Sequence, residues 1–453
     1  MANFFKASVK KSSPTQAKQR LTINIEKLDI NGCGVGRYQN KPIFIEGSLP
    51  TEKVEALLIA QKNKFFQGKL VKINEESKDR ALPLCKHFTL CGGCNIQHLD
   101  YPQQLSFKKT KVIELFSRSG IDTKIIEQLP WQPPIVGKPW HYRRKARIGV
   151  QFNKNAQPTI GFRQKATNQL VAIKSCPTLV EPLNNIFPIL QTLITKLEVK
   201  KAIGHIEVIA SKQQHSKDNL ITLIVRQLRG LTEPDRLLWE SFAQQYRWQL
   251  VFDFGKKAEE IACNGTVLTY TLVENITIQF TQHDFIQVNE HVNQAMVQQA
   301  MLWLALDKSD KVLDLFCGLG NFSLPIATKV KSVVGIEGVQ AMVDKAAANA
   351  IENQLINCQF HQADLNSHWL ELAWAKPHFT KAVLDPARAG AEHAVSQISQ
   401  LGIHTILYIS CNAATLARDS QLLIAQGYKI TQIGLVDMFS QTKHVETMVL
   451  FTK

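Results

Sequence analysis

The stretch KVLDLFCGLGNFSLPIA, residues 311–327, decides the fold of the C-terminal part of the chain. Residues 312–316 form a short apolar run typical of a buried strand, residues 317–320 form a turn that glycines enter easily, and a helix is expected from Phe322. At the carboxyl end of the first strand of a parallel sheet, such a turn lets the backbone approach a nucleotide closely. The stretch therefore predicts an α/β domain of Rossmann-like topology with a cofactor site at this edge.

Glu337 closes the next apolar run, at the distance of about twenty residues where an acid can bind the ribose hydroxyls of a nucleotide. Asp314 lies inside the strand, and no third glycine follows in dinucleotide spacing. These features favour S-adenosylmethionine over NAD as the cofactor. An ordinary strand-to-helix turn is the alternative, and the stretch resembles the first motif of class I methyltransferases.

Composition limits the possible partners. The chain has 453 residues, with 53 Lys and Arg against 38 Asp and Glu, a net charge of +15. About three domains are expected at this length, and the surplus favours a polyanionic partner such as RNA over a merely basic protein. No apolar run approaches the roughly 18 residues of a membrane span, and no secretory signal is evident. We therefore expect a cytoplasmic protein, in which nine cysteines serve metal binding or catalysis.

The N-terminal part predicts a nucleic-acid-binding module. Residues 1–20 carry five cations and no acid and are expected to be a flexible basic arm. Short alternating runs at 21–25, 41–45, 53–57 and 68–73 predict a five-stranded β-barrel of the oligonucleotide-binding kind. Residues 31–37 with 44–50 resemble a TRAM domain, an RNA-binding module, although a barrel without a ligand is the alternative.

These boundaries divide the chain into four parts. The arm is followed by the TRAM-like barrel at 21–78, a central α+β domain at 79–280 and a methyltransferase domain at 281–453. In the central part, residues 101–120 predict a helix whose apolar stripe includes Lys109. Residues 140–147, WHYRRKAR, interleave aromatic and cationic side chains in the manner that holds single-stranded RNA, unless they form a strand with one wet face.

Four cysteines of the central domain predict a metal site. Cys85, Cys91 and Cys94 stand in a C-x5-C-G-G-C pattern, and Cys176 precedes a proline far downstream. Four thiolates suit either zinc or a 4Fe-4S cluster, and the spacing does not choose between them. A chance cluster is the alternative. The expected role of the site is to pin a loop and to shape an RNA-binding surface.

Three further residues follow predicted strands of the C-terminal domain. Asp364 ends the third strand, where it can meet an adenine ring, and Asp385 ends the fourth, where it should face both cofactor and target base. Cys411 ends the next strand just before a helix. The helix dipole is expected to lower the pKa of its thiol and make it a nucleophile, whereas a buried inert thiol is the alternative.

The motif SCNxxTLxRD at 410–419, a late His444-Val445-Glu446 and the cysteine pattern together resemble bacterial 23S rRNA (uracil-C5)-methyltransferases, class I enzymes that depend on S-adenosylmethionine. The resemblance covers nearly the whole chain. It implies a 4Fe-4S cluster at the four cysteines, 23S rRNA as the partner and position 1939 as the target. It also implies cofactor contacts at Gln287, Phe316 and Asn321. No obligate protein partner is evident from the sequence. Many members of the family have a proline where this chain has Ala387.

Uracil chemistry gives Cys411 and Glu446 separate roles. A thiolate that adds at C6 turns C5 into a nucleophile that can take a methyl group. A base, for which Glu446 is the candidate, must then remove the C5 proton before the thiolate can leave. Another rRNA or tRNA uridine is an alternative target, and a non-catalytic iron-sulfur RNA-binding protein is an alternative of another class.

Overall fold

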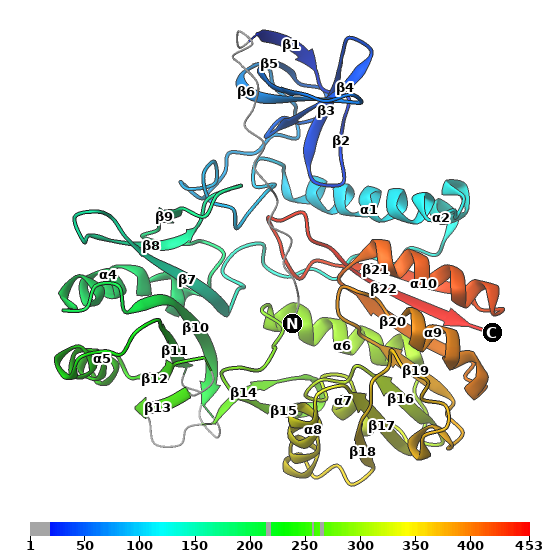
Figure 1. Cartoon of the computed structure of the whole chain (residues 1–453). Coiled ribbons are helices and arrows are strands. Elements are labelled where there is room, and N and C mark those ends of the chain that lie inside the picture. The colour runs from blue at the N-terminus through cyan, green and yellow to red at the C-terminus, as the bar shows by residue number, and fades with distance from the viewer. Residues whose placement is uncertain (1–18, 214–218, 256–257, 263–266) are drawn as a thin grey trace. The chain divides into compact units, whose positions relative to one another are not determined.

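The computed structural model describes residues 19–453 apart from 214–218, 256–257 and 263–266. The chain forms two compact units (Figure 1). Unit 1 runs to Leu82 and includes His98–Gln103, and unit 2 comprises Pro83–Gln97 and Gln104–Lys453. The predicted basic arm lies outside the described residues except at its end, where Arg20 begins the first strand. Within the described ranges, no helix has the length and apolar character needed to cross a membrane.

Unit 1 contains a six-stranded sheet in the order β1-β5-β6-β4-β3-β2. Its strands are β1 (Arg20–Asn24), β2 (Lys27–Leu28), β3 (Cys33–Tyr38), β4 (Lys41–Glu46), β5 (Lys53–Gln61) and β6 (Phe66–Glu75). The prediction of five strands is therefore wrong, since β2 and β3 are both additional to the runs that were recognised. Gly34 and Gly36 lie within β3, where the strand passes very close to its neighbours. A Cβ on Gly36 would lie 2.4 Å from the carbonyl oxygen of Asn24.

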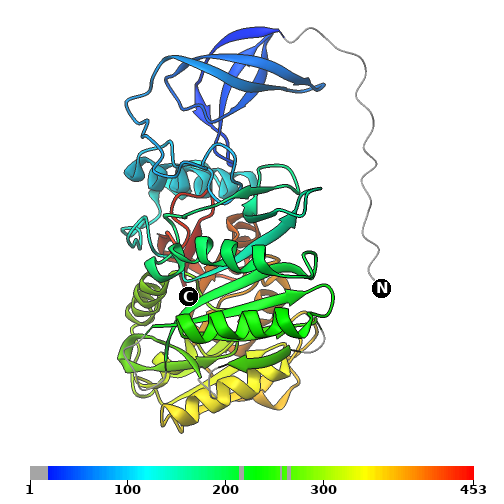
Figure 2. The ribbon, with the colours of Figure 1, turned by 90° about the vertical axis from the view of Figure 1, so that its left-hand side faces the viewer.

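The central part of unit 2 is built on a nine-stranded sheet with the main order β13-β12-β11-β10-β7-β8-β9, to which β14 and β15 are attached. The strands are β7 (Lys145–Phe152), β8 (Pro158–Arg163), β9 (Leu170–Ala172), β10 (Ile203–Gln213), β11 (Asn219–Gln227), β12 (Trp248–Asp253), β13 (Ala258–Ala262), β14 (Leu268–Thr271) and β15 (Thr277–Phe280). Helices α3 (Glu181–Asn184), α4 (Ile186–Lys196) and α5 (Glu233–Tyr246) accompany it. Figure 2 shows α4 and α5 as the green helices covering one face of the sheet, where they bury Phe187, Leu190 and Trp239.

The C-terminal part of unit 2 contains a seven-stranded sheet in the order β18-β17-β16-β19-β20-β22-β21. Its strands are β16 (Lys311–Leu315), β17 (Ser332–Glu337), β18 (Cys358–Gln362), β19 (Lys381–Leu384), β20 (Thr405–Ser410), β21 (Lys429–Val436) and β22 (Glu446–Thr452). The first five in this order are mutually parallel, and β22 is antiparallel to both of its neighbours. The order reverses between β16 and β19, which is where an open α/β sheet binds its ligand. The predicted Rossmann-like α/β fold is confirmed.

Alternating residues of these strands face two cores. Val312, Val333 and Val383 belong to the core beneath α6 (Glu290–Leu304). Their neighbours Leu313, Val334 and Ala382 belong to the opposite core, which contains α1 (Tyr101–Arg118), α9 (Glu392–Ile398) and α10 (Ala413–Ala425). The remaining helices are α2 (Thr123–Gln128), α7 (Ser323–Ala327), α8 (Gln340–Glu352) and the short 3-10 helices η1 (Val273–Asn275), η2 (Ala373–Ala375) and η3 (Ser399–Leu401). Both faces of the parallel sheet are therefore covered, as such sheets require.

Candidate active site

The glycine turn and the acid of the cofactor motif lie together as predicted. β16 pairs with β17 so that Leu315 faces Ile336, which brings Glu337 beside the turn that follows β16. The backbone N–H of Gly318 donates to Glu337 Oε2 at 3.2 Å. Phe316 has a φ of 66°, a conformation that few residues other than glycine adopt. Such backbone strain often occurs at ligand sites.

Asn321 is fixed by a partner that sequence reasoning did not identify. Asn293 of α6 donates its amide to Asn321 Oδ1 at 2.9 Å, and Asn321 donates in return to Asn293 Oδ1 at 3.0 Å. The hydroxyl of Tyr270 also donates a hydrogen bond to Asn321 Oδ1, at 3.4 Å. Gln287 precedes α6 and is half-buried, and its carbonyl accepts from Arg144 at 3.0 Å. The start of α6 and the turn after β16 thus form one hydrogen-bonded unit.

The two other predicted cofactor residues lie at the ends of adjacent strands. Asp364 is exposed just beyond β18, where the backbone N–H of Ala363 donates to the carbonyl of Glu337 at 3.1 Å. Asp385 follows β19 and is half-buried, and burial raises its pKa to about 7. Asp314, which is fully buried and accepts from the hydroxyl of Ser323, has its pKa raised to about 7 by burial first and by nearby Asp385. Acidic groups therefore concentrate along this edge of the sheet.

The loop after Asp385 is tied to the start of α10. Asn412 Nδ2 donates to the carbonyl of Arg388 at 2.9 Å, and Arg418 donates to the carbonyl of Ala389 at 3.1 Å. Ala387 itself is exposed. The anchoring of this loop on α10 thus uses contacts that do not involve the side chain of residue 387.

Cys411 and Glu446 come from the ends of paired strands. β20 and β22 run antiparallel with Ser410 opposite Thr447, so the next residues on each strand, Cys411 and Glu446, lie at the same edge. Glu446 is only 6% exposed, and burial together with Asp385 raises its pKa to about 8 while Lys108 opposes the shift. A carboxyl group with such a pKa can accept a proton near neutral pH.

The thiol of Cys411 differs from the prediction. It lies as expected between β20 and α10, whose N-cap is Asn412. Its pKa, however, is raised rather than lowered, first by burial and then by the charges of Glu446 and Asp385, with Arg388 opposing. The predicted effect of the helix N-terminus on the pKa of this thiol is therefore outweighed, first by burial and then by the charges of the two acids.

His444 adds a neutral ring near the same edge. Its ring packs edge-on against Phe439, with 6.0 Å between the ring centroids. Burial first, and then Arg388 and Lys111 among four nearby cations, lower the pKa of His444 to about 4. The ring is thus uncharged at neutral pH, within a strongly cationic surrounding.

Sequence reasoning also missed Lys108. The predicted helix exists as α1, but it buries Lys108 at 1% exposure and leaves Lys109 exposed, with its ammonium 4.8 Å from the ring centroid of Trp131. The assignment of Lys109 to the apolar stripe is therefore wrong by one position. The sequence held no local signal for this burial, because neighbouring positions on the polar side of an amphipathic helix can both reach solvent.

The stretch 140–147 is more structural than predicted. Tyr142 is buried and donates its hydroxyl to the carbonyl of Ser440 at 3.0 Å. Arg144 is 3% exposed, lies over Tyr270 with 4.7 Å to the ring centroid, and pairs with Glu290 at 3.3 Å. Neither side chain can stack on an RNA base without a rearrangement. The prediction that residues 140–147 bind RNA is therefore wrong for Tyr142 and Arg144.

The four cysteines lie near one another. Burial raises the pKa values of Cys85, Cys91 and Cys94, and the proximity of Cys176 raises each of them further. Cys91 Sγ accepts from the backbone N–H of Gly93 at 3.4 Å. Among the residues that the structure describes, no group of three or more His, Cys, Asp and Glu side chains is arranged around a position for a single metal ion.

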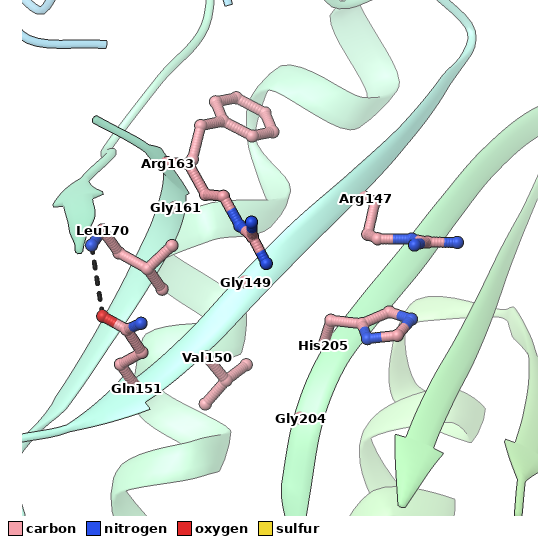
Figure 3. Close-up of a pocket in the computed structure, with 10 residues that line it drawn as sticks. Arg147, Gly149, Val150, Gln151, Gly161, Arg163, Leu170, Gly204 and His205 are labelled. Atoms are coloured by element: carbon pink, nitrogen blue, oxygen red, sulfur yellow. Dashed lines mark hydrogen bonds between the residues drawn. The ribbon is translucent and has the colours of Figure 1, made fainter. Parts of the chain in front are cut away.

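A separate pocket lies on the central sheet (Figure 3). Its floor crosses neighbouring strands at glycines, since Gly149 of β7 pairs with Gly161 of β8 and also with His205 of β10. Arg147 and Arg163 line it with His205. Arg147 is already paired with Glu207, to which its Nε donates at 2.9 Å. The pocket is therefore polar and only moderately cationic.

Comparison with known proteins gives consistent results. The sequence model of the family described as tRNA (Uracil-5-)-methyltransferase matches residues 100–453, and the TRAM domain matches residues 14–71. The 23S rRNA (uracil(1939)-C(5))-methyltransferase RlmD of Colwellia psychrerythraea is 54% identical over 469 residues, covering 100% of this chain and 99% of its own. The protein of the same name from Psychromonas ingrahamii is 44% identical and covers 100% of both chains.

A solved structure also resembles the whole chain. The tRNA (uracil-54, C5)-methyltransferase of Pyrococcus abyssi, in complex with S-adenosyl-L-homocysteine, has a TM-score of 0.71, 20% sequence identity and coverage of 95% of this chain and 100% of its own. At this identity the likeness establishes the fold. The full-length relatives and the match to the family model show that the chain belongs to the RlmD family of 23S rRNA (uracil-C5)-methyltransferases.

Proposed function

We propose that the protein methylates C5 of uridine 1939 in 23S rRNA, with S-adenosylmethionine as methyl donor. The names of the full-length relatives support the target. The observation that carries the chemistry is the meeting of Cys411 and Glu446 at the ends of paired strands, beside Asp385. A nucleophile and a proton acceptor at one edge are what substitution at C5 requires.

Cys411 first gives up its proton to solvent water, and the resulting thiolate adds to C6 of the uracil. The C6–S bond forms while the C5–C6 π electrons move toward O4, which makes C5 nucleophilic. S-adenosylmethionine supplies the methyl group that C5 accepts. Glu446 then takes the C5 proton, the C5–C6 double bond forms again, and Cys411 leaves as a thiolate. The raised pKa of Glu446, about 8, suits a group that must gain this proton.

The residues around the glycine turn fit the methyl donor. Glu337 offers carboxylate oxygens beside the Gly318 N–H, as a ribose requires. Asp364 and Asp385 lie at adjacent strand ends, and Gln287, Phe316 and Asn321 line the turn and the start of α6. The concentration of acids also suits a sulfonium cation.

The four cysteines are proposed to hold a 4Fe-4S cluster. Four thiols gathered from two segments, with a backbone N–H directed at Cys91 Sγ, fit the donor set of such a cluster. When bound, the cluster would join the loop of Cys85, Cys91 and Cys94 to the segment of Cys176. Anaerobically purified protein is expected to contain iron and sulfide, and stoichiometric zinc without iron would refute this assignment.

RNA binding is proposed to involve the TRAM domain and the cationic side chains of unit 2. The TRAM domain contains no catalytic motif, so its contribution is affinity. Deletion of residues 1–74 is expected to weaken RNA binding and to flatten its salt dependence, because fewer phosphates are neutralised. An unchanged salt slope would count against this role.

The target is tested by mapping 5-methyluridine in 23S rRNA from a deletion strain. Loss of the modification at position 1939, and its return on expression of the wild-type protein, is the expected result. Loss at a different rRNA or tRNA position instead would correct the substrate but keep the chemistry. Complementation with Cys411→Ala tests the chemistry itself, because this variant should bind RNA yet form neither adduct nor product.

A further inference from the structure

The loop between β21 and β22, residues 437–445 and here named the base loop, leads directly into Glu446. It lies alongside α1 in unit 2 (Figure 1). Asp437, Met438 and Ser440 are each at most 1% exposed. Polar groups in the buried part of this loop need internal partners, and these partners come from distant parts of the chain.

Lys108 is the central partner of the base loop. Its ammonium forms an ion pair with Asp437 and donates to the carbonyl of Phe439 at 3.1 Å. Asp437 also accepts from the hydroxyl of Ser440 at 2.7 Å through its other oxygen. Both members of the ion pair are 1% exposed.

Stability alone does not explain this buried pair. Removing two charges from water costs so much that apolar residues of similar size often serve as well or better. The position of the pair suggests another use. Val436 lies opposite Glu446 in the β21–β22 ladder, so Asp437 begins the base loop one residue beyond the position that faces Glu446. The charges of Lys108 and Glu446 act on each other. The charge of Lys108 opposes the rise in the pKa of Glu446 that burial and Asp385 produce.

We propose that Lys108 is a positioning residue for proton removal, which holds the base loop and supplies the positive charge beside Glu446. This role rests on the proposed function of Glu446. Asp437 is essential to the role of Lys108. Because Asp437 pairs with Lys108, the ammonium has an anionic partner both when Glu446 is ionised and when Glu446 is protonated. Glu446 can therefore gain and lose a proton without leaving a buried ammonium unpaired.

The other groups near Glu446 do not replace this cation. Asp385 and Cys411 raise the cost of a second negative charge, and both face Glu446 from strand ends. His444 is neutral at neutral pH. Arg388 is exposed and acts on Cys411 and His444. Lys108 is thus the buried cation, among the described residues, whose charge acts on Glu446.

Further hydrogen bonds hold the base loop in its position next to Lys108. Gln104, one turn earlier on α1, accepts from the backbone N–H of Gln441 at 3.1 Å and donates to its side chain at 3.0 Å. Gln441 has a φ of 68°, so this conformation has to be imposed by its surroundings. The backbone N–H groups of Asn95 and Ile96 donate to the carbonyl of Gln441 at 3.1 and 3.3 Å. The segment that follows Cys94 therefore also holds the base loop.

The test separates proton removal from the steps before it. RNA containing 5-fluorouridine at the target position carries no C5 proton, so it reports attack by Cys411 and methyl transfer without any need for Glu446. Lys108→Met is expected to form this fluorouridine adduct at the wild-type rate. With ordinary RNA, its product formation should fall about tenfold for each unit by which the pKa of Glu446 rises, with recovery at higher pH and accumulation of a methyl-labelled adduct.

Three control variants make the test decisive. Lys109→Met alters the exposed neighbour on the same helix and should behave as wild type. Lys108→Arg keeps the charge and should restore much of the turnover. Lys108→Met combined with Asp437→Leu leaves no unpaired buried carboxylate, so it should fold even if the single variant does not, and it should show the same slow proton removal.

Four results would overturn the role of Lys108. They are equal slowing of the fluorouridine adduct and of the product, an unchanged pH profile, a double variant with wild-type turnover, and a Lys108→Arg variant no better than Lys108→Met. If the wild-type protein forms the fluorouridine adduct but Lys108→Met turns over normally, only this role fails. A wild-type protein that forms neither adduct nor 5-methyluridine would refute the proposed function itself.

Discussion

The glycine turn and the base loop both complete the candidate active site, but they are held in different ways. The turn is fixed by Glu337, only 19 residues from Gly318 in the sequence. The base loop is fixed by Tyr142 and Gln104, which are 298 and 337 residues away from their partners in it. The contact between the glycine turn and Glu337 is therefore local to one β-α-β unit, whereas the base loop before Glu446 depends on the tertiary fold of unit 2.

The largest expected effect is at the end of the base loop. Glu446→Gln keeps the shape of the side chain but removes the proton acceptor, so turnover should fall by roughly 10²- to 10⁴-fold. Because the block follows methyl transfer, a denaturation-resistant protein–RNA adduct carrying a labelled methyl group should accumulate. Normal turnover, or an adduct without label, would move the role to another group, of which His444 is the next to test.

The second-largest effect is expected from a change at Glu337, and it should be confined to cofactor binding. Glu337→Ala removes the carboxylate beside the glycine turn, and loss of a charged hydrogen-bond partner costs about 1.5–3 kcal/mol. The affinity for S-adenosylhomocysteine, measured by calorimetry, should therefore fall roughly 10- to 100-fold. The same variant should still form an adduct between Cys411 and fluorouridine RNA when cofactor is saturating. An unaffected affinity would mean that Glu337 only braces the turn.

A remote change should act on the base loop alone. Gln104→Leu removes both side-chain hydrogen bonds to Gln441, at a cost of about 1 kcal/mol for each bond. Turnover is expected to fall by at most roughly 30-fold, while the affinity for S-adenosylhomocysteine stays at the wild-type value. If both quantities fell together, the cofactor side and the base loop would not be independent of each other.

The smallest effect concerns stability. The pKa of Glu446, about 8 against a usual value of 4.5, means that the folded protein binds this proton more tightly than the unfolded chain does. The stability that the protonated group contributes is complete below pH 4.5 and is lost as the pH rises to about 8. Glu446→Gln lacks this loss. The Tm of the variant minus the Tm of the wild type should therefore be larger at pH 8 than at pH 5. If this difference were the same at both pH values, the raised pKa of Glu446 would be contradicted.

This contrast also explains how much the sequence could predict. The strand, the turn and Glu337 lie within one short segment, so their periodicity and spacing were enough to identify the sheet edge. Cys411 was located in the same way, between an apolar strand and a helix. The direction of its pKa shift could not be predicted from the sequence. The shift depends on burial and on the charges of Glu446 and Asp385, which strand pairing in the folded sheet brings close to Cys411.

Lys108 shows what the sequence could not predict about the base loop. Helical periodicity identified α1 but could not decide which lysine of the pair is buried, since that depends on an aspartate 329 residues away. In unit 1, β3 was missed because glycines that suggest a turn can equally permit close packing of strands, as at Gly36. Local patterns thus predicted the elements, and long-range contacts decided the charges.

The position of β22 has a consequence for how the protein is made. β22 follows β21 in the chain but lies between β20 and β21 in the sheet. While the chain is being synthesised, β20 and β21 are therefore complete before the strand that joins them exists, and each has an unpaired edge. The nascent chain would expose these edges to aggregation or to a chaperone until residues 446–452 emerge. Because the same strand begins with Glu446, closing the sheet and bringing the proposed proton acceptor to Cys411 would be a single folding event.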